Sequence, residues 1–92
     1  MSSLIVSAAA EPNSYFVEVR DRTVTKHQVA VRPEYLRELG VGGVSPEKIL
    51  EASFAFLLER ESNTSILRRF DLSEIEHYFP EFRTEIGRRV KA

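Results

Sequence analysis

Residues 45–61 have the sequence SPEKILEASFAFLLERE, and this stretch decides the fold. Ser45 can cap the free backbone N–H groups of a first helical turn, and Pro46 suits the first helical position because its missing N–H has no partner there. Glu47 then places a negative charge at the positive end of the helix dipole. We therefore expect one long helix from Ser45 to about Glu61.

Apolar side chains cover too much of this helix for a single neighbour. At about 100° per residue they span about 240° of the circumference, whereas a surface helix needs an apolar stripe of roughly 100°. Either the helix is the centre of the domain, or a second subunit covers part of it, and both explanations stay open. In the second case, the candidate self-association residues are Ile49, Leu50, Phe54, Phe56 and Leu57.

Upstream of the helix, two strand-like runs predict a β-hairpin. Residues 15–20 alternate along the chain, and residues 23–31 are rich in β-branched side chains. Only a short polar gap separates the two runs, which is typical of paired neighbouring strands. Pro33 then predicts the start of a short helix, and Gly40 predicts a left-handed cap at its end.

Downstream of the long helix, the pattern predicts two or three short helices. Asp71 and Glu74 have the spacing of a capping box at one helix start. The sequence therefore predicts an α+β fold, with a hairpin, a short helix, the long helix and the short C-terminal helices in one domain over residues 14–92. Residues 1–13 are small and polar, and we expect a flexible lead-in, either without regular structure or with a short edge strand at Leu4–Val6.

Composition excludes several classes of protein. The chain has 92 residues, of which 42% are apolar and 29% charged, and it has no cysteine. Disulfide scaffolds and thiolate zinc sites are therefore excluded. No apolar run is long enough for a membrane span, and we expect a cytoplasmic protein with no membrane partner. The net charge of -1 does not favour nucleic acid as the partner.

No catalytic motif is present in the sequence. The two histidines, His27 and His77, have no metal-ligand spacing, and the glycines form no phosphate-binding loop. Glu74, Glu76, His77 and Glu81 form an acidic cluster around one imidazole, but a solvated helix face explains it better than a weak divalent-metal or acid/base site. We therefore expect no enzyme activity, no metal and no cofactor.

Residues 23–61 resemble ribbon–helix–helix regulators in the order strand, short helix, turn and longer helix. In that family, strands from two chains form a ribbon that enters the DNA major groove. The resemblance implies that Lys26 and Gln28, on the outward side of the strand, would contact DNA.

Residues 33–86 resemble a group of small bacterial proteins to which no function is assigned. The resemblance is carried by SPEKIL (45–50), FLLERE (56–61), SILRRFDL (65–72) and YFPE (78–81). It implies a bacterial source and a compact module, and no activity or site residues.

Two functions follow as expectations. The first is a small non-enzymatic protein-interaction or regulatory module, self-associating as a homodimer or binding another protein. The alternative is a ribbon–helix–helix-like DNA-binding regulator or antitoxin. The aromatic segment Tyr78–Phe82 is either a docking surface or a corner of the core, since exposed aromatic side chains are frequent interface anchors.

Overall fold

One four-stranded sheet forms the base of the protein in the computed structural model, which describes residues 3–91. The strands are β1 (Ser3–Ala8), β2 (Ser14–Arg20), β3 (Val24–Ala30) and β4 (Arg69–Asp71), and they lie in that order across the sheet. The first three are antiparallel neighbours, and β4 is parallel to β3. A parallel neighbour needs a crossover connection, and the chain makes it through two helices.

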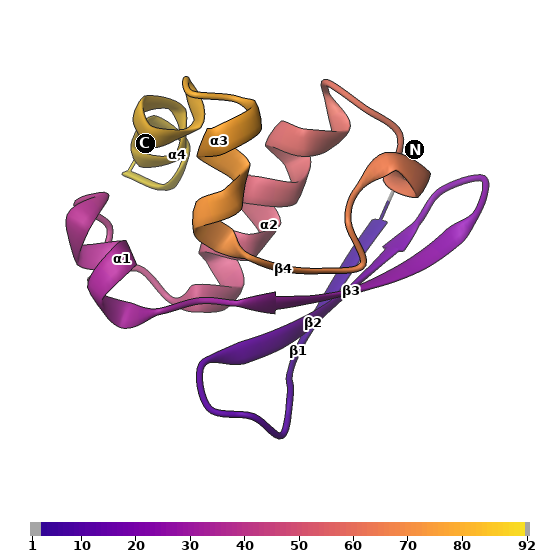
Figure 1. Ribbon diagram of the computed structural model, residues 1–92, viewed down its shortest axis with the longest axis horizontal. Helices are drawn as coiled ribbons and strands as arrows, with labels where there is room; N and C mark the ends of the chain where they lie inside the picture. The colour runs from indigo at the N-terminus through magenta and orange to yellow at the C-terminus, as the bar shows by residue number, and fades with distance from the viewer. Residues whose placement is uncertain (1–2, 92) are drawn as a thin grey trace.

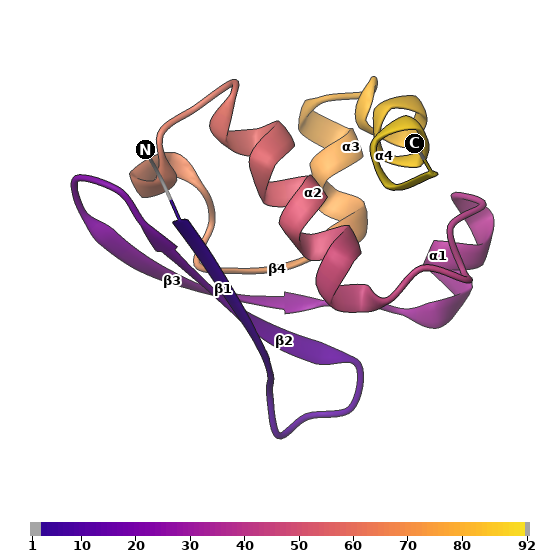
Figure 2. The ribbon, with the colours of Figure 1, turned by 180° about the vertical axis from the view of Figure 1, so that it is seen from behind.

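Four α-helices cover one side of this sheet (Figures 1 and 2). They are α1 (Pro33–Glu38), α2 (Pro46–Leu58), α3 (Ile75–Tyr78) and α4 (Phe82–Lys91), with single 3-10 turns η1 (Asn63–Ser65) and η2 (Leu72–Glu74). The protein is therefore an α+β fold of two layers. Within the described residues, none of these helices has the length and apolar character needed to cross a bilayer.

The long helix begins as predicted. Ser45 Oγ accepts a hydrogen bond from the Lys48 backbone N–H at 3.3 Å, and Pro46 is the first helical residue. The helix ends at Leu58, earlier than the expected Glu61. Its centre packs on the sheet, where the Phe54 ring lies 5.4 Å from the imidazole of His27 and 6.1 Å from the ring of Phe70.

The predicted hairpin is confirmed as β2 and β3. Their register places Val17 opposite His27 and Val19 opposite Thr25, and all four side chains are buried toward the helices. The short helix α1 also follows, starting at Pro33. Gly40 has φ +77°, the left-handed conformation expected after that helix.

The prediction of a flexible lead-in over residues 1–13 is corrected over Ser3–Ala8, which form β1, whereas its first two residues lie outside the described part of the chain. The strand pairs with β2 over six residues, from Ser3 opposite Arg20 to Ala8 opposite Tyr15. Leu4 and Val6 turn toward the core and are partly buried, while Ile5 faces outward. This alternation is the strand pattern, and it extends beyond the short edge strand at Leu4–Val6.

The second difference is β4, where short helices had been expected. The Gln28 N–H donates to the Arg68 carbonyl at 2.7 Å, which holds the segment extended beside β3. The capping box is confirmed immediately after it: the Asp71 side chain accepts from the Ser73 N–H, and Glu74 accepts from the Asp71 N–H at 2.9 Å. Two short helices, α3 and α4, then complete the chain.

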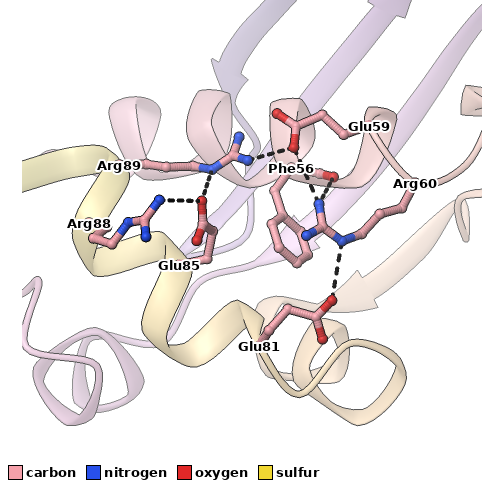
Figure 3. A network of polar contacts seen from close by, with 7 residues as sticks. All are labelled: Phe56, Glu59, Arg60, Glu81, Glu85, Arg88 and Arg89. Atoms are coloured by element: carbon pink, nitrogen blue, oxygen red, sulfur yellow. Dashed lines mark hydrogen bonds and ion pairs between the residues drawn. The ribbon is translucent and has the colours of Figure 1, made fainter.

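A polar network fastens α4 to α2 (Figure 3). The Arg60 guanidinium lies 3.7 Å from the centre of the Phe56 ring and donates to Glu81 at 3.3 Å. Arg89 donates to Glu59 at 2.6 Å and to Glu85 at 3.2 Å. Hydrogen bonding from Arg89 lowers the pKa of Glu59. Each of these groups has its partner within the network, so we interpret the network as a structural contact between α2 and α4.

Candidate protein-binding pocket

The apolar arc of α2 is covered within one chain. The five predicted self-association residues are all at most 4% exposed: Ile49, Leu50, Phe54, Phe56 and Leu57. The sheet covers one side of the helix, and Phe56 meets Phe79 and Phe82 from the C-terminal segment at ring distances of 6.0 and 5.3 Å. The proposed interface on these side chains is therefore corrected, because the domain's own core uses them.

A pocket of about 200 Å³ opens beyond the end of α2, between this helix, the segment leading into β4, and α3. We call it the α2–α3 pocket. Its walls are mainly apolar. The lining consists of Leu57, Glu61, Ser65, Ile66, Leu67, Phe70, Glu74, Ile75, Tyr78 and Phe79. Ile66, Phe70 and Ile75 form a buried part of the wall, so an apolar group entering from solvent would meet a packed apolar surface.

Two exposed large side chains lie on the lining. Tyr78 is 67% exposed and Leu67 is 47% exposed. The aromatic segment Tyr78–Phe82 is therefore divided: Tyr78 is open to solvent, whereas Phe82 is fully buried and Phe79 packs on Phe56. The core interpretation is confirmed for Phe79 and Phe82, whereas the docking interpretation stays a prediction, for Tyr78.

The pocket also contains a carboxylate without a partner. Glu61 is partly buried, and burial raises its pKa. Among residues 3–91, no side chain donates a hydrogen bond to it or forms an ion pair with it, and no lysine, arginine or histidine lines the pocket in that range. A cation brought by a ligand would offset the burial of this charge.

Buried polar contacts hold the pocket wall in place. His27 Nδ1 lies 2.8 Å from the Leu67 carbonyl, which can only accept, so Nδ1 carries the proton. Nε2 of the neutral ring then accepts from the Thr25 hydroxyl at 2.9 Å, and Thr25 accepts from Asn63 Nδ2 at 3.1 Å. Burial lowers the pKa of His27, and the charge of Arg68 acts in the same direction, although the hydrogen bond to Leu67 opposes them. His27 is thus a structural residue that positions Leu67.

The residues predicted to contact DNA lie on the open face of the sheet. Lys26 is exposed, and its Nζ lies 4.0 Å from Glu18. Gln28 donates to Glu11 and to Ser14, each at 3.2 Å. Their strand, β3, has β2 on one side and β4 on the other. Within the chain, β2 pairs along the whole of β3 and β4 pairs with Gln28–Ala30, an arrangement that does not favour the intermolecular ribbon expected from the resemblance.

The acidic cluster predicted around His77 is dispersed among different partners. Glu74 accepts from the Asp71 N–H, and Glu81 accepts from Arg60. Glu76 accepts from the Tyr35 hydroxyl at 2.6 Å and from Arg83, and these bonds lower its pKa. In the part of the chain that the structure describes, no three acidic or histidine side chains are placed to hold a metal ion.

Comparisons with protein families, with curated proteins and with solved structures found no match to this chain. Sequence reasoning singled out Tyr78 but missed Glu61 and Leu67. A charged residue at the end of the long helix was the available signal for Glu61, but only the fold shows that it is half-buried beside an apolar wall.

Proposed function

We propose that this protein is a small non-enzymatic module that binds a segment of another protein in the α2–α3 pocket. The observation that carries the proposal is the combination of an open apolar wall with an unpartnered, half-buried carboxylate. The favoured ligand is a peptide segment that places an apolar side chain in the pocket and a neighbouring lysine or arginine beside Glu61.

Each part of this ligand follows from a property of the pocket. Packing the ligand's apolar side chain against the nearly buried Ile66, Phe70 and Ile75 gives the driving force, because it removes the apolar area of that side chain from water. Tyr78 and Leu67 add exposed contact area at the entrance. A charged hydrogen bond to Glu61 supplies selectivity, since bonds to ionised groups are stronger than neutral ones.

Selection from a displayed random-peptide library on the immobilised protein tests the proposal. We expect enrichment of sequences with an apolar residue next to lysine or arginine. Fluorescence anisotropy of an enriched peptide should show about tenfold weaker binding to Glu61→Gln, which corresponds to about 1.4 kcal/mol. Tyr78→Ala should also weaken binding.

Val24→Ala is the matched control, because Val24 is exposed and lies on β3 outside the pocket. It should bind the peptide as the wild type does. The proposal fails if no sequence is enriched, or if Glu61→Gln, Tyr78→Ala and Val24→Ala all bind with wild-type affinity. In the latter case the peptide binds another surface.

A further inference from the structure

The free edge of β1 is a second surface suited to binding another chain. The sheet ends at β1 on one side and at β4 on the other. Figure 2 shows β1 nearest the viewer, with no other segment crossing in front of it. Within the described residues, therefore, one side of a six-residue strand pairs with nothing.

The register identifies which backbone groups are free. The Ala9 N–H donates to the Ser14 carbonyl at 2.9 Å, which marks a hydrogen-bonded pair of β1 and β2. Such pairs alternate along an antiparallel ladder, so the backbone groups of Ile5 and Ser7 point toward β2. The N–H and C=O groups of Leu4, Val6 and Ala8 then point outward along the free edge.

β1 lacks the features that normally protect a sheet edge. Natural edge strands are kept from pairing by charged side chains, proline, bulges or short length. The sequence SLIVSA of β1 contains no charge and no proline, and its six residues pair with β2 in continuous register. On its outer face, Ile5 is 47% exposed and Phe16, on the neighbouring strand, is 44% exposed.

We infer that β1 pairs antiparallel with β1 of a second copy of this chain, joining two sheets into one about a two-fold axis. Opposed residues in an antiparallel pair share a face. With the axis at Val6, Val6 opposes Val6, Leu4 opposes Ala8, and Ile5 opposes Ser7. This register uses every outward-pointing backbone group identified above.

The chemistry of the edge favours a second copy over a charged or dissimilar strand. All opposed pairs in this register are apolar or small and neutral, so no charge is buried without a partner. The partly buried side chains of Leu4 and Val6 would be covered further on the core face. The net charge of -1 gives little repulsion between two copies. This dimer differs from one made through α2, and none of the residues that line the α2–α3 pocket belongs to β1.

Sedimentation equilibrium over a concentration series, with amide hydrogen exchange by NMR, tests this inference. We expect a monomer–dimer equilibrium. Exchange at Leu4, Val6 and Ala8 should slow at least about tenfold as the dimer forms, because solvent-facing amides become hydrogen-bonded. Ile5 and Ser7 should be protected at all concentrations by their bonds to β2.

Ala8→Pro and Ala8→Thr form a matched pair of variants. The proline removes an outward N–H while leaving the bonds to β2, as edge strands tolerate, and should weaken the dimer by about tenfold or more. The threonine keeps that N–H and should dimerise. Ile5→Lys, at an exposed position opposite Glu18, is a second variant that should dissociate the dimer without unfolding the chain.

Two results overturn the inference. One is a monomer at millimolar concentration. The other is a dimer in which the amides of Leu4, Val6 and Ala8 still exchange freely, which would place the interface elsewhere. Circular dichroism of each variant shows whether a loss of dimer reflects the edge or a loss of fold.

Discussion

The two edges of the sheet are held in opposite ways. β1 pairs with β2 over six residues but buries little side-chain surface, whereas β4 pairs with β3 over only three. β4 compensates with buried contacts: Phe70 is in the core beside Phe54, and the preceding Leu67 carbonyl accepts from His27. A long ladder therefore holds one edge, and side-chain packing holds the other.

The same two edges differ in what they offer to another chain. β4 is short and carries charges that are already paired, Arg69 with Glu11 at 3.3 Å and Asp71 with Arg32 at 2.9 Å. β1 is longer and neutral. Short length and charge are ordinary means of closing an edge. The difference indicates that only the β1 side is suited to extending the sheet.

The largest expected effect comes from removing the packing of β4. Phe70→Ala should lower the free energy of unfolding by about 3–5 kcal/mol, because a buried ring is lost and a cavity remains. Urea denaturation measures it. Ile5→Ala on β1 is the comparison variant and should change stability by about 0.5 kcal/mol or less at low protein concentration. Similar losses in both variants would mean that the edges are held alike.

Both edges were difficult to find in the sequence, for different physical reasons. β4 has three residues, too few to show an alternating pattern, and Ile66, Leu67 and Phe70 have a spacing that also fits a helix face. Its extended form depends on the Gln28 N–H, which is 40 residues away from Arg68 along the chain. Such a contact leaves no local signal.

β1 was recognised only at Leu4–Val6, because serine and alanine at its ends have weak strand preference. Pairing with β2 stabilises the extended conformation at the ends of β1, where the local strand preference is weak. By contrast, α2 was predictable because its cap, its proline and its apolar spacing all lie within the helix itself. The pocket was the least predictable feature. Glu61, Leu67 and Tyr78 line it together only because the tertiary fold places β4 beside β3.

A smaller effect on the free energy of unfolding should come from the protonation of His27. This residue stabilises only the β4 edge of the sheet, through its hydrogen bond to the Leu67 carbonyl. Burial lowers the pKa of His27 below its ordinary value of 6.5, so near and below that pH the unfolded chain binds a proton that the folded chain does not. Stability should therefore be full above about pH 6.5 and fall as the pH decreases through the folded-state pKa.

His27→Gln should flatten this pH dependence in urea denaturation between neutral and mildly acidic pH. The glutamine amide can still donate toward the Leu67 carbonyl but does not titrate. His77→Gln, at an exposed position on α3, is the matched control and should keep the wild-type profile. If the wild type and His27→Gln lose stability in parallel as the pH falls, other groups cause the loss.

The smallest effect should come from replacing Arg69. The size of this effect shows whether charge or side-chain packing holds β4 beside β3. The ion pair of Arg69 with Glu11 joins two side chains that are both more than 60% exposed, and exposed pairs contribute little because water and salt screen them. Arg69→Ala should therefore change the free energy of unfolding by about 0.5 kcal/mol or less. Any difference from the wild type should shrink when urea denaturation is repeated at high salt. A loss approaching that of Phe70→Ala would show that charge, more than packing, places β4 beside β3. A small loss leaves Arg69 the role of keeping that edge closed, the role for which β1 has no equivalent residue.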